Sequence, residues 1–470
     1  MRSKRIALSF ILVMVALAGT VPLLRLVRSK QTSTAEASFA DLERVVLSEL
    51  SETNTPGAAI GIVRGDRLVF ARGFGVANIE TGEPVRPEML FRLGSTTKMF
   101  TAAGLLKLVE ARKIDLDSPI GKYAKGLDPA IARITPAQLL SHSAGLRDAA
   151  VMFGKHDDAE LGVTVRALNE QSLFTEPGRV YSYANPGYWL AGYVTEEVSG
   201  RAYADELSES LFKPLGMTRT TIRPTMAITF PLAQGHDGSP TEKPHVIRPL
   251  ADNAGNWPAG SMFSSITDLS RFVIAFMNGG RIDGVQVLSR ELISMMSTPR
   301  VEIPGTDSKY AFGLNIGTFN GVRVVQHGGS RSGFGSLIRM FPDKQIAVIL
   351  LINRTGGSLN KTVRKVTELL IPGAAREDSK PRPREMTALE MARYVGGFGE
   401  GADRITISIK AGQLVYARGR FETPLVRIND SRLSAVQAGQ APAVEIGIAF
   451  ASDGRAEFLI LGGRALKRAP

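Results

Sequence analysis

Serine and lysine stand three residues apart at three places in the chain, a spacing that can support nucleophilic catalysis. On a helix, two residues with this spacing lie on one face, so the lysine amine can reach the serine hydroxyl. An amine that is partly removed from water can be neutral and act as the base that activates the serine. The three pairs are Ser95 and Lys98, Ser210 and Lys213, and Ser358 and Lys361.

The flanking sequence favours Ser95 among the three serines. It follows a strand-like run over 90–93 and a glycine, and it opens an apolar helix expected over about 95–112. A strand-to-helix junction is where a nucleophile is presented, and the positive end of the helix dipole lies at the serine. By contrast, Ser210 is expected mid-helix on an exposed face, and Ser358 as the cap of the last helix. The structural alternative for Ser95 is an N-cap.

Two other short motifs could line a cleft together with this serine. Tyr183 and Asn185 stand two apart in a loop just before an expected helix, where a phenol and an amide can face one cleft. His327 ends an alternating strand, and the next two residues, Gly328 and Gly329, would let a substrate lie close to the strand edge. The structural alternatives are a buried tyrosine with a turn asparagine, and a loop histidine.

The order of these motifs resembles the serine β-lactamase and penicillin-binding-protein superfamily. That family carries Ser-x-x-Lys, then Tyr-x-Asn, then Lys-Thr-Gly, for which this chain has His-Gly-Gly. The flanking text is similar to the class C β-lactamase, D-aminopeptidase and esterase branch, and the resemblance covers about 40–371. The stretches that carry it lie at 91–101, 139–146, 181–188 and 258–265.

By position, the resemblance implies a role for each motif residue. Ser95 is the nucleophile that becomes acylated, and Lys98 is its base. Tyr183 relays a proton to the leaving group, positioned by Lys98 and Asn185. The backbone N–H groups of the nucleophile and of Ser330 form the oxyanion hole, where each donor is worth on the order of 3–4 kcal/mol.

The strand with His327 and Gly329 lines the cleft, and it departs from the family pattern. The fixed cation and the hydroxyl that would hold a substrate carboxylate are missing, and an unperturbed imidazole is largely neutral near pH 7. The departure favours small esters, amides or D-amino-acid peptides as substrates. One alternative is a β-lactamase or D-Ala-D-Ala carboxypeptidase, in which another cation such as Arg331 holds the carboxylate. A second alternative is a catalytically weak binding or scaffold member of the family.

Composition narrows the functional classes. Of 470 residues, 44% are hydrophobic and 22% are charged, which is typical of globular proteins. The net charge is +12, but six basic and no acidic residues stand in the first 30, so the remainder carries only +6 and nucleic acid is not an expected partner. Without cysteine there is no disulfide or thiolate zinc site, and the five histidines lack metal-ligand spacing. No cofactor or metal is expected.

Residues 1–37 are predicted to be an export signal or a membrane anchor. A basic stretch at 2–5 precedes the uncharged residues 6–24, and small residues at 16–18 suit a signal peptidase. Nineteen uncharged residues could also just span a bilayer. Either way the body is expected outside the cytoplasmic membrane, periplasmic or extracellular, with membrane contact only if the segment stays uncleaved. The oligomeric state is left open.

The rest of the chain is predicted to hold two units. Within 38–371, strand patterns occur at both ends and helices in the middle, which predicts one sheet built from both ends, in an α+β or α/β sandwich. The pattern predicts a hairpin turn at 64–67, a strand over 346–352 and a last helix over about 359–370. The family resemblance implies an antiparallel β-lactamase/transpeptidase-like sheet flanked by helices, with a helical subdomain. Residues 372–386 are a charged, proline-rich linker, and 387–470 are expected to form a small, lipocalin-like all-β barrel. The strands expected in it cover 404–410, 414–418, 425–428, 445–450 and 457–461. Because the first unit holds all the motifs, we expect it to be active without the barrel.

Overall fold

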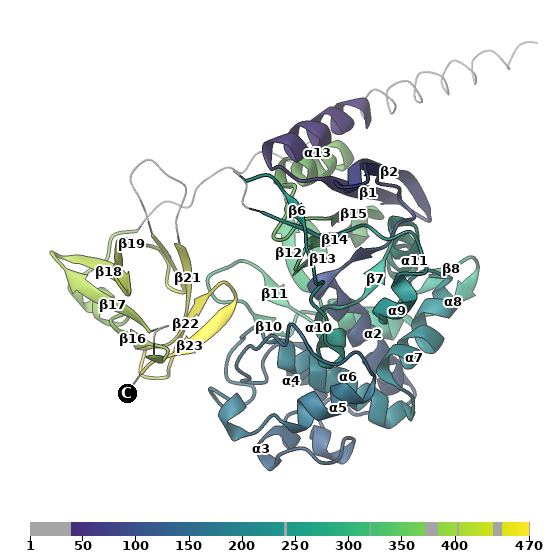
Figure 1. Cartoon of the computed structure of the whole chain (residues 1–470). Coiled ribbons are helices and arrows are strands. Elements are labelled where there is room, and N and C mark those ends of the chain that lie inside the picture. The colour runs from purple at the N-terminus through teal and green to yellow at the C-terminus, as the bar shows by residue number, and fades with distance from the viewer. Residues whose placement is uncertain are drawn as a thin grey trace, which may run out of the picture.

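The computed structural model describes residues 39–238, 242–319, 321–371, 384–401, 404–435 and 444–469. They form an α+β unit up to residue 371 and an all-β unit from 384 onward (Figure 1). The predicted leader and most of the predicted linker lie outside these residues. Within the described ranges, no helix is long and apolar enough to cross a membrane.

The α+β unit is built on one antiparallel sheet, to which nine strands of the described chain contribute. The strand at the start of the unit, β1, pairs with the last strand, β15, so the prediction of one sheet built from both ends is confirmed. In order across the sheet, the strands are β10 (Val301–Glu302), β11 (Lys309–Tyr310), β12 (Asn315–Phe319), β13 (Val322–Arg331), β14 (Phe334–Phe341), β15 (Ile346–Ile352), β1 (Gly57–Arg64), β2 (Arg67–Asn78) and β3 (Glu83–Pro84).

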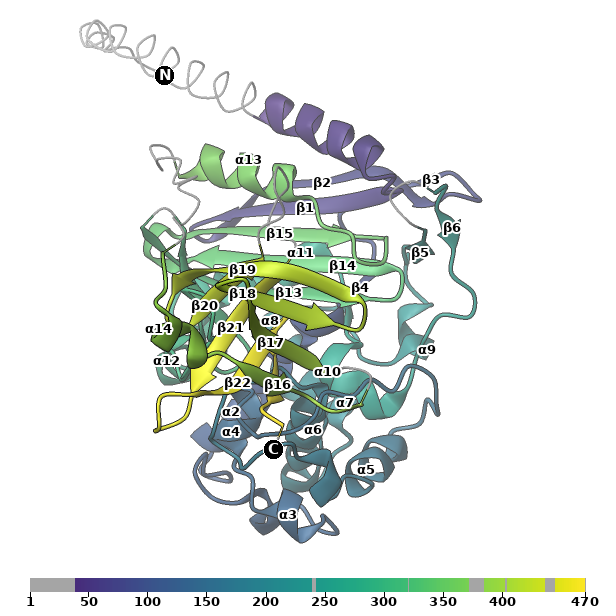
Figure 2. The same ribbon diagram turned by 90° about the vertical axis from the view of Figure 1, so that its left-hand side faces the viewer.

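Both faces of this sheet are buried. Alternate residues of a strand point to opposite faces. In β15, Ile349 and Leu351 therefore join the core on one side of the sheet, where α2 (Thr97–Glu110) and α11 (Ile266–Met277) lie. Val348 and Leu350 join the core on the other side. There the helix over 39–52 and α13 (Asn360–Leu370) cover the sheet (Figure 2). This double burial explains why 346–352 is a continuous apolar run.

A helical part fills the chain between β2 and β10 and surrounds α2. The first ten residues of α2, 97–106, are buried on every side of the helix. The elements packed against it include α6 (Asn185–Ser199), α7 (Tyr203–Leu207), α10 (Trp257–Gly260) and α12 (Arg290–Ser297). The sequence pattern predicted an apolar helix here, but its position at the centre of the unit is a tertiary feature.

The described part of the C-terminal unit is an eight-stranded antiparallel meander that nearly closes into a barrel. A bridge between Phe398 and Arg468 joins its first and last strands. Its interior is filled by apolar side chains such as Tyr394, Ile407 and Leu459. The strands are β16 (Gly396–Phe398), β17 (Ile405–Lys410), β18 (Gln413–Arg418), β19 (Phe421–Asn429), β20 (Arg432–Ala435), β21 (Val444–Phe450), β22 (Ala456–Leu461) and β23 (Arg464–Lys467).

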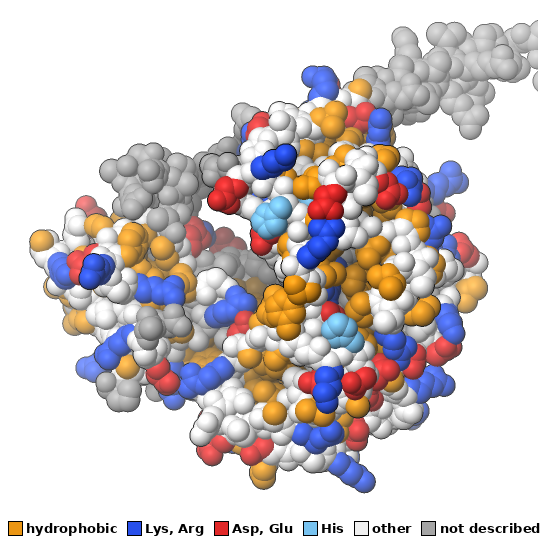
Figure 3. Space-filling model, in the orientation of Figure 1, with side chains coloured by type: hydrophobic (Ala, Val, Ile, Leu, Met, Phe, Trp, Pro, Cys, Tyr) orange, Lys and Arg blue, Asp and Glu red, His pale blue; other side chains and the backbone are white. Residues whose placement is uncertain are grey.

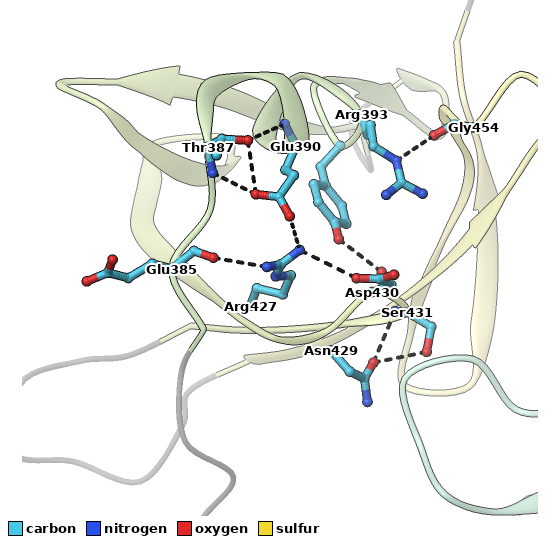
Figure 4. Close-up of polar contacts among 10 residues, drawn as sticks. Glu385, Thr387, Glu390, Arg393, Arg427, Asn429, Asp430, Ser431 and Gly454 are labelled. Carbon is cyan, nitrogen blue, oxygen red and sulfur yellow. Dashed lines mark hydrogen bonds and ion pairs between the residues drawn. The ribbon is translucent and has the colours of Figure 1, made fainter.

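A short helix, α14 (Ala388–Ala392), is fastened to this barrel by a polar network (Figure 4). Thr387 and Glu390 form a capping box at the helix N-terminus. The carboxylate of Glu390 also accepts a hydrogen bond from Arg427 in β19 at 2.9 Å, and Arg427 donates to the Glu385 carbonyl at 2.9 Å. The chain that enters the barrel is thereby held against the strand it must pair with.

The two units are in contact, which the sequence did not indicate. Val180 of the α+β unit packs with Phe458 and Ile460 of β22. Ala465 N–H donates to Ser182 Oγ at 3.1 Å, and Arg179 forms an ion pair with Glu457 at 2.8 Å. The barrel is therefore docked beside the loop that precedes α6.

Candidate active site

Ser95 lies in a single 3₁₀ turn (Gly94–Thr96) between β4 (Phe91–Arg92) and the start of α2. Gly94 has a φ of +56°, a left-handed conformation that turns the chain from strand to helix. The turn is fixed from both sides: Thr97 Oγ1 donates to the Gly94 carbonyl at 2.7 Å, and Ser336 Oγ donates to the Leu93 carbonyl at 2.6 Å. The predicted strand-to-helix presentation of this serine is therefore what the structure has.

Strand β13 runs directly beside this turn, and glycine is required on both sides. A Cβ on Gly329 would lie 1.9 Å from the Leu93 carbonyl oxygen, and a Cβ on Gly94 would lie 2.6 Å from that of Ser330. Such distances are impossible for a methyl group. The backbone of Ser330 thus lies against the serine turn, where an oxyanion hole formed with Ser95 N–H is expected.

Lys98 is fully buried in the first turn of α2. Its Nζ lies 2.8 Å from Asn185 Oδ1, 2.7 Å from the Ala259 carbonyl oxygen and 3.3 Å from Ser95 Oγ. Burial holds the pKa of this amine well below its usual value. A neutral amine has two hydrogens for the two carbonyl-type oxygens and one lone pair, which leaves the lone pair for the Ser95 hydroxyl.

Tyr183 stands across the serine from Lys98, whose Nζ is 4.8 Å from the centre of the phenol ring. Burial raises the pKa of Tyr183 above its usual value, and a hydrogen bond with the Ser95 side chain partly offsets that rise. The phenol is consequently protonated at neutral pH. It is suited to pass a proton on, and not to act as a fixed anion.

Asn185, the first residue of α6, is held by a carboxylate that sequence reasoning missed. Asp148 Oδ1 accepts from the backbone N–H of Asn185 at 2.8 Å and from its Nδ2 at 3.0 Å. These bonds satisfy the first turn of α6 and aim Asn185 Oδ1 at Lys98. Asp148 carries no motif signature, being separated from Asn185 by 37 residues.

His142 supports the same loop and was also missed as a site residue. Its backbone has a φ of +58°, its Nδ1 accepts the Ala184 N–H at 3.2 Å, and its ring centre lies 4.2 Å from that of Tyr183. It belongs to the stretch 139–146, which the sequence analysis used only for the family resemblance. That stretch was the available signal.

His327 is buried and neutral. Its Nδ1 donates to the Gly328 carbonyl at 2.6 Å, so Nε2 is the acceptor for the Tyr310 hydroxyl at 2.9 Å. Burial lowers the pKa of His327 to about 4, and the nearby Lys98 contributes to the decrease. At neutral pH this position offers no cation to a substrate. Gly328 beside it is exposed.

Most of the predicted site residues border one pocket of about 900 Å³. The predicted site residues on its wall are Ser95, Tyr183, Asn185, His327, Gly329 and Ser330, while Lys98 is bonded to Ser95 from behind. The buried Arg331 also lines it, with the charge of Asp252 nearby. Three barrel residues, 462–464, complete the wall. The first unit holds all the motifs, but the barrel also contributes to the pocket wall, and activity of the first unit without the barrel stays a prediction.

The other two Ser-x-x-Lys pairs differ from the first. Lys213 pairs with Glu209 and Lys361 with Glu52, and both lysine side chains are about two-thirds exposed. Ser210 lies in a π-helical turn with its Oγ buried, contrary to the exposed face expected for it. Ser358 precedes the N-cap of α13, which is Leu359. Among the described residues, no cluster of three or more His, Asp or Glu side chains could hold a metal ion.

Comparison with known proteins agrees with this geometry. The family model described as "Beta-lactamase" matches residues 39–370. The chain belongs to this family. It is 30% identical over 320 residues to "Penicillin-binding protein 4" of Amycolatopsis lactamdurans, covering 64% of this chain and 82% of that relative. It is 25% identical over 373 residues to "D-aminopeptidase" of Gluconobacter oxydans, covering 77% and 68%.

A solved structure extends the likeness to the barrel. "Crystal structure of SurE with D-Leu" has a TM-score of 0.73 and 25% identity, and the match covers 92% of this chain and 99% of that one. A match restricted to residues 39–370 would cover a smaller share of this chain than 92%, so the match includes most of the C-terminal unit. The arrangement of a β-lactamase-like unit with a docked barrel thus recurs in another protein.

Proposed function

We propose that this protein is a serine hydrolase that forms an acyl-enzyme on Ser95. The observation that carries the proposal is the burial of Lys98 against Ser95 Oγ with its pKa held low. A neutral amine at this distance takes the hydroxyl proton as the oxygen attacks a carbonyl carbon. Family membership supports the same chemistry.

The reaction divides into two steps. In the first, a bond forms between Ser95 Oγ and the substrate carbonyl carbon, and Lys98 takes the hydroxyl proton. Tyr183 relays that proton from Lys98 to the leaving amine or alcohol as the bond between the leaving group and that carbon breaks. In the second, water attacks the same carbon, its proton passes through Lys98 and Tyr183 to Ser95 Oγ as the carbon–Oγ bond breaks, and the acid is released. The backbone N–H groups of Ser95 and Ser330 hold the oxyanion in both steps.

The substrates we propose are D-amino-acid amides or peptides and small esters. The neutral His327 and the bare Gly328 offer no permanent charge to a free carboxylate. A pocket of about 900 Å³ accommodates a short peptide. The relatives named D-aminopeptidase and SurE with D-Leu support a D-configured substrate.

A second candidate is hydrolysis of β-lactams or of peptides with a free C-terminal carboxylate. Arg331 favours it, because this buried cation lines the pocket four residues beyond His327. A charge-assisted contact from it would be worth roughly 1.5–3 kcal/mol, about ten- to a hundredfold in rate. The relative named penicillin-binding protein 4 is consistent with this candidate.

A labelling and substrate panel tests these proposals. We expect a fluorophosphonate probe to modify wild-type protein at Ser95, and D-amino-acid p-nitroanilides or p-nitrophenyl esters to exceed nitrocefin in kcat/KM. Faster hydrolysis of nitrocefin would support the second candidate, and Arg331→Gln should then remove that preference. Absence of both labelling and turnover would contradict a hydrolase and favour a binding or scaffold role.

We also propose that the protein acts outside the cytoplasmic membrane on a small-molecule substrate. The basic and apolar pattern of residues 1–37 supports export. On the face shown in Figure 3, basic and acidic side chains are interspersed, with no continuous basic stripe for nucleic acid. Expression of the full chain in a bacterial host, followed by fractionation and N-terminal sequencing, distinguishes a cleaved signal from an anchor; recovery in the cytosol would contradict export.

A further inference from the structure

The turn between β22 and β23 carries barrel residues into the active site. Gly463 accepts the backbone N–H of Tyr183 at 2.9 Å, and the next residue but one, Ala465, donates to Ser182 Oγ. A Cβ on Gly463 would lie 3.9 Å from Tyr183 Cβ. The turn therefore packs against the segment that holds the predicted proton relay, and it delivers Arg464 to the pocket wall.

Arg464 ends a chain of four side chains that leads to the base. Its Nε and Nη2 lie 2.7 and 2.6 Å from Asp148 Oδ2. The other oxygen of Asp148 accepts both hydrogen bonds from Asn185, and Asn185 Oδ1 accepts from Lys98. The two oxygens of one carboxylate thus join the barrel to Asn185.

We propose that Asp148 and Arg464 are positioning residues of the hydrolase, so that docking of the barrel is a condition of a competent active site. The proposal rests on the function proposed above. Neither residue needs to touch the reacting atoms: both act through Asn185 and Lys98.

Asp148 fixes which end of the Asn185 amide faces the base. A carboxylate only accepts hydrogen bonds, so it binds Nδ2 and turns Oδ1 toward Lys98. With the amide reversed, its NH₂ group would meet the amine, and one donor would lose its acceptor inside the protein. The orientation of Asn185 is therefore imposed by Asp148.

The carboxylate of Asp148 also favours protonation of Lys98, and Arg464 offsets this effect. The negative charge of Asp148 raises the pKa of Lys98 and favours an ammonium, which cannot act as a base, whereas Arg464 lowers that pKa. Arg331 also lowers it, and the rings of Tyr183 and Tyr188 lie within 5.4 Å of Nζ. Lys98 also interacts with two histidines, His142 and His327, which burial keeps neutral.

The effect is expected in the chemistry more than in stability. The Arg464 side chain is 50% exposed and that of Asp148 is 17% exposed. An ion pair this close to solvent contributes modestly to folding. Its action on a fully buried amine is larger, because the field within the pocket is screened less. A pH profile is accordingly the informative measurement.

The test measures the rate of fluorophosphonate labelling against pH, which needs no knowledge of the natural substrate. It compares full-length wild type with Arg464→Gln, Arg464→Lys and Asp148→Asn. The matched control is Arg179→Gln, because the Arg179–Glu457 pair joins the same two units, with side chains 52% and 20% exposed, and does not line the pocket.

The acid limb is the part of the profile where the labelling rate falls as Lys98 becomes protonated. Arg464→Gln and Asp148→Asn should move this limb in opposite directions. Arg464→Gln should shift it upward by about one pH unit, so labelling falls about tenfold at pH values on the acid limb and recovers at higher pH. Arg464→Lys should restore most of the rate. Asp148→Asn keeps an acceptor for Asn185 but removes the charge, and its limb should shift downward. Arg179→Gln should match wild type.

Failure of the proposal is distinguishable from failure of the function. A wild type that is not labelled contradicts the hydrolase itself. If wild type is labelled but the variants lose rate equally at every pH, or keep the wild-type profile, the positioning role is wrong and the turn only packs. A profile shift in Arg179→Gln as large as that in Arg464→Gln would likewise overturn it, because barrel contact in general would be responsible.

Discussion

The segments that lead into α2 and α13 carry the same Ser-x-x-Lys spacing, and their serines line the same pocket, yet their lysines are chemically opposite. Lys98 is completely buried and bonded to Ser95, Asn185 and a carbonyl. The Lys361 side chain is 66% exposed and forms an ion pair with Glu52. Both serines follow a glycine, so local sequence does not separate them.

The difference shows that the Ser-x-x-Lys spacing lets the amine contact the serine hydroxyl, whereas burial makes that amine neutral and therefore able to act as a base. Removal from water lowers the pKa of Lys98, whereas the hydrogen bond with Glu52 raises the pKa of Lys361. An ammonium has no lone pair with which to take a proton. The cause is position in the fold: α2 is enclosed by other helices, while α13 lies on the opposite face of the sheet.

The largest effect is expected when the serines are exchanged for alanine. Ser95→Ala should abolish fluorophosphonate labelling and turnover, while Ser358→Ala should retain both. The measurement is intact-protein mass after labelling, followed by peptide mapping. Modification of Ser358 in the wild type, or activity that survives in Ser95→Ala, would overturn the comparison.

Replacing each lysine by arginine tests whether a neutral amine at residue 98 is the base. Lys98→Arg should lower the labelling rate by about 10²–10⁴-fold, because guanidinium does not give up its proton at accessible pH. Lys361→Arg, which keeps a cation beside Glu52, should label at the wild-type rate. Equal rates for the two variants would show that Lys98 is not the base.

Burial of the His327 imidazole predicts that the free energy of unfolding depends on pH. Its pKa in the folded protein is about 4, against about 6.5 when exposed, so the unfolded chain binds the proton first as pH falls. The contribution of His327 to the free energy of unfolding is fully present above about pH 6.5 and declines by roughly 2–3 kcal/mol toward pH 4. Urea unfolding of His327→Gln should therefore show a weaker pH dependence than wild type; an identical slope would contradict the burial argument.

The smallest predicted effect concerns the close packing that buries Lys98. Gly329→Ala should destabilise the protein by roughly 1–3 kcal/mol and reduce labelling, because its Cβ would strike the Leu93 carbonyl at 1.9 Å. The adjacent Gly328→Ala is the control, since its Cβ would meet nothing nearer than 3.7 Å. Thermal melting compares them, and equal melting temperatures would mean that β13 can move away from the serine turn.

Much of the fold followed from local pattern. The run 346–352, the hairpin around 64–67 and the helix ending at residue 370 were predicted within a few residues of β15, β1–β2 and α13. Strands β16, β20 and β23 were missed. They are three or four residues long, and short strands owe their stability to pairing with neighbours more than to their own composition.

The sequence by itself determined that the side chains within each motif can lie close together, because helical and loop spacing are local properties. These pairs are Ser95 with Lys98 and Tyr183 with Asn185. Only the tertiary structure decided which lysine is neutral, since desolvation depends on what surrounds a group. It alone joined Arg464 to Asp148 across 316 residues, in a turn without any motif. The reason is physical: spacing fixes distances along the chain, whereas pKa and charge pairing depend on groups that folding brings together.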